Sequence, residues 1–584
     1  MKLLLRLLAL FTINLGFAQL YVSPSNNADH FIYVKDRLVY VEKGIEMYAN
    51  KNKDVEASIY LRKDAQLIQG EKNSNYNKGD GKISVFQTGT SNQYDYNFWG
   101  LPIKIPDGKN YLLNDFIYDP MGKTESRPAK LISALDGKSD PLSISDRWLY
   151  SFSGTEYSDW NYLGDNFQLQ PGEGFSMKGV SGYNFSEIEG EAINTGNRQT
   201  YDFRGLPNDG NIELSIRKEQ ILLVGNPYPS AIDLNKFLLE NTNTTGIAYF
   251  WDSAENVNSH YLADYEGGYG AYSAGTGIYI PPVFVNYGTN ATGNNSGKII
   301  PRRFAPIAQG FMIEGSNDGL VSFKNSHRIY KKQENGISEF KTSENELQSV
   351  KFEIITSDTY HHFLALAFDP NSSEKADRAL DAKSHNETPS FVFWNIEDEH
   401  YVIDVRPKKD EDLIPLKISM EKNGPIEFKV NEMANFDPDR IFLYDSRDNL
   451  YFGIKTGSLK FDLSAGKYEN RFFITFIENL PAVDNTSKDK PGILSAKPPN
   501  ILLNTIDIFQ NNALEQLEIR ILYETDIKEI SLFDLNGKRL FNQKFTKNEK
   551  EYYLPTGNLS NGIYIVKVFT KDKNELSKKV GVKN

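Results

Sequence analysis

The chain has 584 residues, of which 39% are hydrophobic and 13% aromatic. One hydrophobic core stops growing well below that length, so several packed domains are expected and general disorder is excluded. The formal net charge is −12 and there is no cysteine. These two facts argue against a nucleic-acid partner and exclude disulfides, thiolate catalysis and iron–sulfur clusters.

A cleaved signal peptide is predicted over residues 1–18. Two basic residues precede the short apolar run Leu7–Ile13, and small residues lead to a cleavage site between Ala18 and Gln19. The apolar run is too short for a membrane anchor, which needs about 20 residues. No other stretch is long and apolar enough, so we expect no transmembrane segment after signal cleavage.

The rest of the chain predicts a mainly β fold with several β-sandwich-like domains. Strand-like runs at short spacing with few helices favour sandwiches over a parallel sheet. We expect a β-rich region of one or two domains over 19–335 and a β-sandwich over 346–480. The polar segment Glu334–Asn345 separates them, and residues 481–500, rich in Pro, Ser, Lys and Asp, form an exposed tether.

One helix is predicted in the N-terminal region, over Ala231–Asn241. Ser230 or Asp233 is the expected N-cap. Gly225–Ser230 precedes it with two prolines, which fix the backbone. This segment is predicted to be a rigid turn that seats the helix, rather than a loop that binds a ligand. The helical residues expected to pack inward are Ile232, Phe237 and Leu238.

After the tether, residues 501–584 predict a small all-β domain with an Ig-like sandwich fold. Leu517–Leu522 alternates with a period of two. Asn536-Gly537 lies between two apolar runs, which is the strongest short hairpin signal because both turn positions need positive φ. Ile563–Phe569 is the most apolar strand of this region.

This terminal domain resembles the type A sorting domain of the type IX secretion system of Bacteroidota. Ser531–Lys538 resembles the family's hairpin, Leu559–Val568 its "L-x-x-G-x-Y-x-x-x-V" strand, and Lys578–Val580 its basic ending. The residues that carry the resemblance are Asp534, Asn536, Gly537, Gly562, Tyr564, Lys578 and Lys579.

The resemblance implies export to the periplasm and then across the outer membrane, with the type IX secretion machinery as partner. It also implies that the sorting domain is clipped off. The product is then released or attached to surface lipopolysaccharide, so we expect a secreted protein or one on the outer-membrane exterior.

Five upstream segments resemble segments of flavobacterial surface proteins with no assigned activity. They include "Y-x-Y-x-x-W-x-x-P" and "GNPYPS-A-x-D" patterns. The resemblance therefore informs location rather than chemistry. The segments are Tyr94–Pro102, Leu223–Asp233, His260–Tyr265, Gln309–Ile313 and Asn325–Arg328.

The strongest enzyme signal is Glu187-Ile188-Glu189-Gly190-Glu191. On one strand, the three carboxylates would share a face. A jelly-roll laminarinase-like family carries E-x-D-x-E on a strand, and retaining glycosidases place two carboxyl groups about 5 Å apart. Against this, Gly190 weakens a strand, and a solvated acidic edge explains the same pattern.

No other motif predicts chemistry, and we name no catalytic, cofactor-binding or metal-ligating residue. His361 and His362 are adjacent, so on a strand they point to opposite faces and cannot hold one metal together. The tryptophans are expected mainly in cores, with exposed platforms for sugar rings as the alternative. They are Trp99, Trp148, Trp160, Trp251 and Trp394.

The function these features favour is a non-enzymatic adhesin or binding module with an extracellular glycan or protein ligand. No cofactor is expected. One alternative is a polysaccharide hydrolase that uses Glu187, Glu189 or Glu191. Another is a structural component of the cell surface or the motility apparatus, which self-assembly would reveal.

Overall fold

The computed structural model contains two compact units, and strands dominate both, which confirms the mainly β fold class. The first unit comprises residues 1–408, 419–422 and 430–436, and the second comprises the remainder. The predicted signal peptide up to residue 17, Glu334–Asn345 and the tether lie outside the described residues, so the predicted domain boundaries stay predictions. The structure describes residues 18–583 except 71–75, 109, 183–185, 255–257, 287–296, 333–346, 387, 436–440, 455–457, 478–505, 513, 522–525, 535–537, 546–548 and 572–574.

The first unit begins with two stacked turns of a β-solenoid. Each of its first three strands pairs in parallel with the strand three places later: β1 with β4, β2 with β5, and β3 with β6. Parallel pairs therefore open a chain for which the sequence favoured sandwiches. The strands are β1 (Ala18–Val22), β2 (Ile32–Lys35), β3 (Leu38–Val41), β4 (Gly44–Met47), β5 (Ile59–Arg62) and β6 (Gln66–Gln69).

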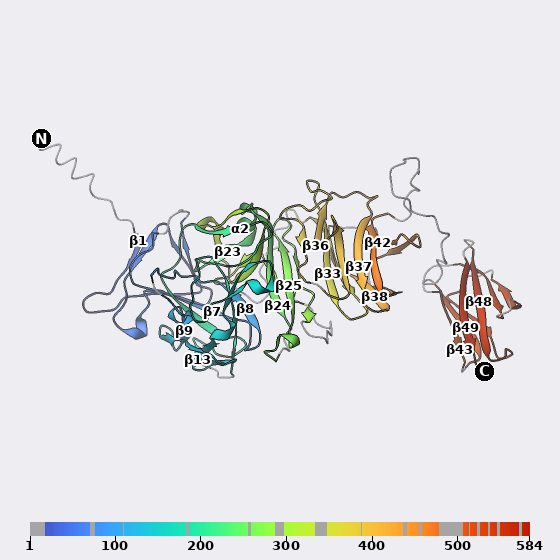
Figure 1. Cartoon of the computed structure of the whole chain (residues 1–584), viewed down its shortest axis with the longest axis horizontal. Coiled ribbons are helices and arrows are strands. Elements are labelled where there is room, and N and C mark those ends of the chain that lie inside the picture. The colour runs from blue at the N-terminus through green and yellow to red at the C-terminus, as the bar shows by residue number, and fades with distance from the viewer. Residues whose placement is uncertain are drawn as a thin grey trace. The chain divides into compact units, whose positions relative to one another are not determined.

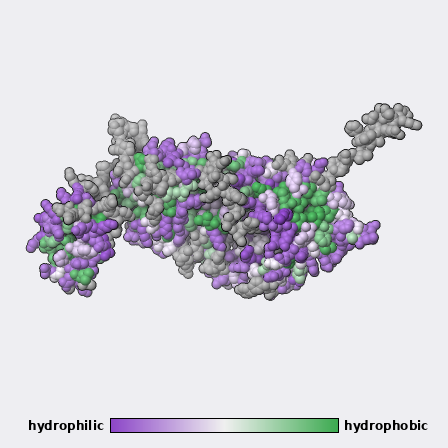
Figure 2. Space-filling view, turned by 180° about the vertical axis from the view of Figure 1, so that it is seen from behind, coloured by the Kyte–Doolittle hydropathy of each residue, from purple (hydrophilic) through white to green (hydrophobic). Residues whose placement is uncertain are grey.

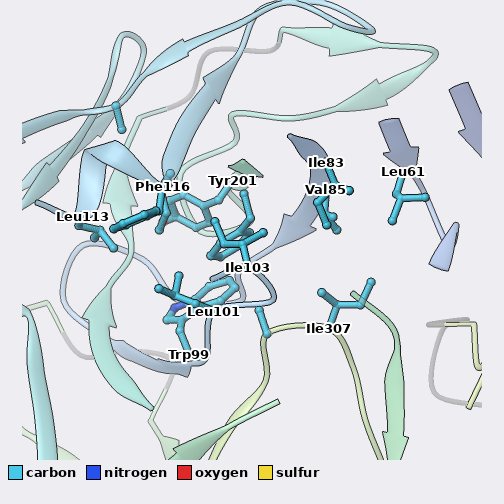
Figure 3. Close-up of a cluster of buried hydrophobic side chains, with 14 of the residues drawn as sticks. Leu61, Ile83, Val85, Trp99, Leu101, Ile103, Leu113, Phe116, Tyr201 and Ile307 are labelled. Atoms are coloured by element: carbon cyan, nitrogen blue, oxygen red, sulfur yellow. The ribbon is translucent and has the colours of Figure 1, made fainter. Parts of the chain in front are cut away.

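The solenoid continues into a six-stranded sheet of order β10-β9-β20-β7-β5-β2. Side chains of this sheet and of neighbouring segments form a hydrophobic cluster that contains Trp99, Phe116 and Tyr201 (Figure 3). Trp99 and Tyr201 meet edge to face, with ring centroids 5.4 Å apart. The added strands are β7 (Ile83–Thr88), β9 (Ile117–Pro120), β10 (Ser126–Pro128) and β20 (Thr200–Gly205).

A ten-stranded sheet forms the centre of the first unit. Its main path runs β26-β25-β24-β29-β22-β14-β16-β8, with β15 paired to β14 and β27 to β25. The strands are β8 (Tyr96–Trp99), β14 (Tyr150–Gly154), β15 (Trp160–Tyr162), β16 (Phe175–Lys178), β22 (Ile221–Gly225), β24 (Thr244–Ser253), β25 (Glu266–Ser273), β26 (Tyr279–Ile280), β27 (Val285–Asn286) and β29 (Gly310–Gly315).

The predicted helix is present as α2 (Leu234–Glu240), and Asp233 is its N-cap. The carboxylate of Asp233 accepts a hydrogen bond from the Asn235 amide at 3.0 Å. The helix begins later than predicted because Ala231–Asp233 forms strand β23, which pairs with β28 (Phe304–Ala305) and β31 (Arg328–Ile329). Phe237 packs on Phe323 with ring centroids 4.4 Å apart.

A second sheet of the first unit packs against one face of the ten-stranded sheet. It belongs to a sheet of eleven strands, and its strands in the first unit follow the order β35-β36-β33-β32, with β34 beside β36. One hydrophobic cluster joins Tyr249 and Met312 of the ten-stranded sheet to Ala365 and Ile403, and Figure 1 shows β24 and β25 beside β33 and β36. The strands are β32 (Gln348–Ile355), β33 (His361–Phe368), β34 (Ala382–Lys383), β35 (Phe391–Ile396) and β36 (Glu399–Arg406).

The second unit ends in seven strands that enclose one hydrophobic cluster. Three form a sheet of order β43-β44-β47, and four form a sheet of order β46-β45-β48-β49. Two packed sheets agree with the predicted small all-β domain, and its Ig-like topology stays a prediction. The strands are β43 (Ile506–Asn511), β44 (Gln516–Ile521), β45 (Ile527–Phe533), β46 (Arg539–Lys544), β47 (Glu551–Pro555), β48 (Gly562–Thr570) and β49 (Glu575–Val582).

The remaining elements are short strands and 3-10 turns of the first unit, and six strands between residues 414 and 475, two of which have ten or more residues. Among the described residues, no helix is long and apolar enough to cross a membrane. They are β11 (Lys130–Ile132), β12 (Gly137–Ser139), β13 (Leu142–Ser145), β17 (Val180–Ser181), β18 (Glu187–Ile188), β19 (Glu191–Ala192), β21 (Ile212–Ile216), β30 (Gly319–Phe323), β37 (Ile414–Met420), β38 (Gly424–Ala434), β39 (Phe442–Asp445), β40 (Leu450–Gly453), β41 (Ser458–Leu463), β42 (Gly466–Thr475), and the 3-10 turns η1 (Lys53–Val55), η2 (Leu113–Asp115), η3 (Asp146–Trp148), η4 (Tyr157–Asp159), η5 (Leu262–Asp264) and η6 (Asn325–His327).

Candidate functional site

The first unit contains an aromatic cavity of about 620 Å³ on one face of the ten-stranded sheet. Alternate residues of a strand share a face, so Tyr96 and Phe98 of β8 both line it, as do Tyr249 and Trp251 of β24. Its volume lies within the range of about 300–1,000 Å³ that is usual for ligand pockets. The lining residues are Tyr96, Phe98, Trp148, Tyr150, Phe152, Thr155, Glu156, Tyr157, Ser158, Trp160, Ser176, Ile221, Tyr249, Trp251, His260, Tyr265, Tyr269, Met312 and His385.

Three of the five tryptophans line this cavity. Trp160 on β15 lies opposite Phe152 on β14, and their ring centroids are 5.0 Å apart. Trp251 on β24 lies opposite Tyr269 on β25, at 5.2 Å. Cross-strand pairing therefore holds the rings side by side on one surface. The other two tryptophans, Trp99 and Trp394, are buried in cores.

One wall of the cavity is built around Lys178, whose residue surface is only 3% exposed. Its ammonium nitrogen lies 3.8 Å from the ring centroid of Trp148 and donates a hydrogen bond to the Tyr265 hydroxyl. The same nitrogen is 3.1 Å from His260 Nδ1, and His260 Nε2 is 2.8 Å from Asp136 Oδ1. Burial lowers the pKa of Lys178 to about 7, although Asp95 and Asp136 oppose that shift.

The His260 ring is held by stacking in addition to its polar contacts with Lys178 and Asp136. Its ring stacks on Trp148 with centroids 5.3 Å apart and an interplanar angle of 9°. The Tyr265 hydroxyl in turn donates to the Tyr94 carbonyl at 2.6 Å. A chain of polar contacts thus runs from Asp136 through His260 and Lys178 to Tyr265 and connects the residues of this wall.

A second histidine borders the cavity at another point. His385 Nε2 lies 3.5 Å from Glu314 Oε2, and the His385 ring centroid is 4.3 Å from that of Tyr249. The only carboxylate among the described lining residues is that of Glu156, which lies beside the 3-10 turn η4. The cavity therefore offers aromatic faces, hydroxyl and imidazole groups and one carboxylate to a ligand.

The row of three carboxylates considered for a hydrolase is absent, because Glu187 and Glu191 lie on different strands of a hairpin. β18 and β19 pair antiparallel, with Glu189 and Gly190 in the turn at φ of 54° and 82°. Two positive φ values define the tight hairpin turn that suits strand twist. The expectation of one strand was wrong because it placed this turn inside a strand.

Glu189 has structural partners on the solenoid. Its Oε2 accepts a hydrogen bond from the Tyr33 hydroxyl at 2.9 Å and lies 3.2 Å from Lys35 Nζ. Burial alone would raise the pKa of Glu189, but these two partners, together with Lys123 at 3.4 Å, outweigh it and hold the pKa below its usual value. A glycosidase acid needs a raised pKa, so Glu189 is unsuited to that role.

The two adjacent histidines lie on strand β33, where neighbouring side chains point to opposite faces of the sheet. His361 Nδ1 is 2.6 Å from Glu353 Oε1, whereas His362 is buried and burial lowers its pKa to about 4.

Gly225–Ser230 is a buried turn rather than an open loop. The Asn226 side-chain amide donates to the carbonyls of Ser230, Ala305 and Pro306.

The residues expected to mark sorting and cleavage lie at both ends of the chain. Ala18 begins β1 and Gln19 follows it, and Asn536 and Gly537 lie outside the described residues. The Asp534 carboxylate accepts a hydrogen bond from the Lys538 backbone amide at 2.8 Å. Gly562 begins β48. Tyr564 is buried, and its hydroxyl donates a hydrogen bond to the Ser560 carbonyl at 2.7 Å. Lys578 and Lys579 lie on β49, opposite Val566 and Ile565 respectively.

Comparison with known proteins identifies two regions. The profile of the secretion system C-terminal sorting domain matches residues 507–583, so the protein is exported by the type IX system to the cell surface or the extracellular space. No curated protein matches the chain. The profile of a domain of unknown function (DUF8693) matches residues 126–476, more than half of the chain, including most residues that line the aromatic cavity. The chain therefore belongs to the DUF8693 family.

Proposed function

We propose that this exported protein is a non-enzymatic binding module of the adhesin type that holds an extracellular glycan in the aromatic cavity. The observation that carries the proposal is the gathering of Trp148, Trp160 and Trp251 on one concave surface. The flat apolar faces of sugar rings pack on such aromatic rings. Tyr hydroxyls and imidazoles beside the rings supply hydrogen bonds that orient a ligand.

The charges around the cavity favour a neutral glycan. Glu156 lines the cavity, and Glu314 lies directly behind His385. Lys178, the lysine around which the described wall is built, has a pKa near 7 and lies between the negative charges of Asp95 and Asp136. An acidic polysaccharide would meet repulsion there, whereas a neutral one would not.

Binding is favoured over hydrolysis by the distribution of carboxylates. Both glycosidase mechanisms need two carboxyl groups that flank the scissile bond. Within the described lining of the cavity, Glu156 stands alone, and the hairpin that carries Glu187, Glu189 and Glu191 contacts the solenoid through Lys35 and Lys63.

Replacement of Trp160 tests the proposal. Calorimetric titration of the whole chain with laminarihexaose and cellohexaose, and with oligogalacturonate as the acidic probe, should show binding of a neutral oligosaccharide. Trp160→Ala should weaken that binding at least tenfold, since truncation of a central aromatic contact costs more than about 1.4 kcal/mol. Tyr553→Ala removes an aromatic ring that is exposed on β47, outside the cavity, and should leave affinity unchanged. Equal effects of the two variants, or binding of none of the three probes, would contradict the proposal.

We further propose that the sorting signal resides in the seven residues named for the resemblance, and that the mature protein remains on the outer-membrane exterior by attachment to lipopolysaccharide. Lys578 and Lys579 are neighbours on β49, the last described strand, where Lys579 is exposed and can present its charge to the secretion machinery. Mass spectrometry of the surface-retained product, which identifies its new C-terminus and any attached lipopolysaccharide, tests the attachment.

A further inference from the structure

The first turn of the solenoid, formed by β1, β2 and β3, is an open end. Each of these strands is paired on one side, with β4, β5 and β6 respectively. Within the part of the chain that the structure describes, none of the three has a strand on its other side. The first turn therefore presents three strand edges, one on each face of the solenoid, at the same end of the solenoid.

The hydrophobic interior is also incompletely covered at this end. Ile45, Ile59 and Leu67 of the second turn are fully buried. Their counterparts in the first turn, among them Leu20 and Ile32, are only partly buried. A solenoid turn cannot bury its own stacking face and depends on a neighbour to do so. Hydrophobic surface is visible in green toward this end of the first unit in Figure 2.

The edge of β3 is available for pairing. The amides of Gln66 and Gly70 donate to the carbonyls of Arg37 and Val41, so the peptide group of Leu38, between them, points away from β6. Leu38 itself is 42% exposed. An exposed strand edge with apolar side chains and no proline is a template for a further strand.

We propose that this open end is a docking surface for a second copy of this chain, joined edge to edge by antiparallel β-pairing. A body that pairs with all three edges at once must itself carry three edges in the same arrangement, and another copy does so across a two-fold axis. Residues 19–43 hold three acidic and three basic side chains, so the surface is neutral on a chain of net charge −12. Two copies therefore meet there without net repulsion.

Light scattering on the chain from Gln19 to its end tests the proposal. The molar mass should double between nanomolar and micromolar concentration. Leu38→Lys places a charge on the docking surface and should shift the midpoint of dimerisation at least tenfold. Leu320→Lys, at a position on β30 that is 48% exposed, is the matched control and should dimerise normally. A monomer at every concentration, or equal loss in both variants, would overturn the proposal.

Hydrogen exchange locates the contact independently of any substitution. Amides in peptides that cover β1 to β3 should exchange more slowly at micromolar than at nanomolar concentration, whereas those of β30 should not change. Protection elsewhere with no change in β1 to β3 would place the interface on another surface and overturn the proposal.

Discussion

At the residue scale, Lys178 is a buried amine enclosed by aromatic rings and polar groups. Its amine lies under the ring of Trp148 and beside His260 and Tyr265. In the unfolded chain the pKa of a lysine is about 10.4. In the folded protein it is about 7, because burial disfavours the ammonium ion.

This pKa shift predicts a pH dependence of stability. Between about pH 7 and pH 10 the unfolded chain binds the proton that the folded protein has released, so the lysine's contribution to folding becomes more favourable as the pH rises. Lys178→Met removes the buried charge. The variant should therefore gain stability relative to the natural chain at pH 7, and this advantage should shrink toward pH 10.

Hydrogen exchange of β16 peptides, corrected for the intrinsic dependence on pH, measures the local free energy of opening at each pH. Lys218→Met, at an exposed site, is the control and should show no such trend. A stability difference for Lys178→Met that stays constant from pH 7 to pH 10 would contradict the assigned pKa.

Individual site residues were partly visible in the sequence. Aromatic residues at alternate positions, such as Tyr96 with Phe98 and Tyr249 with Trp251, indicate strands with one aromatic face. That these residues line one cavity could not be predicted from the sequence. It depends on the order of strands in the ten-stranded sheet, which places β8 near β14 and β24 beside β29. Composition favoured core positions for the tryptophans, with exposed platforms as the alternative. The structure buries Trp99 and Trp394, whereas the other three line the cavity.

At the element scale, α2 is a short helix whose start depends on Asp233. The carboxylate satisfies the Asn235 amide, which has no partner within the helix. Asp233→Ala should lower the free energy of unfolding of this region by about 1 kcal/mol. Lys236→Ala, at an exposed helical position, is the control and should change it by less than about 0.5 kcal/mol. Urea denaturation of both variants decides, and equal midpoints would contradict the capping role.

The helix was predictable because its apolar spacing and its cap are local signals. The Glu187–Glu191 hairpin was missed because five residues with alternating acids also fit a single strand. The parallel turns at the start were missed because their signal is a repeat rather than a local pattern. Ile32-Tyr33-Val34-Lys35 and Ile59-Tyr60-Leu61-Arg62 are related segments that pair residue for residue in β2 and β5.

At the scale of the whole molecule, the sorting domain determines where the chain goes. Residues 507–583 match the sorting family and form two sheets around one core. A chain that ends at Asn500 should therefore accumulate in the periplasm, whereas the full chain should reach the surface or the medium. Cell fractionation with immunoblotting distinguishes the two.

Tyr553→Ala, on the exposed face of the sorting domain, keeps its core intact and serves as the control for export. Arrival of the truncated chain in the same compartment as the full chain would show that another part of the protein directs secretion.

The division of the tryptophans has a practical consequence. Trp148, Trp160 and Trp251 line the cavity, whereas Trp394 is 0% exposed and Trp99 is nearly so. Indole emission responds to contact with water, so the three cavity rings should change their fluorescence when a ligand displaces solvent, while the two core rings supply a constant background. The protein thus carries its own optical sensor of occupancy, and unlabelled extracellular material can be screened by emission alone.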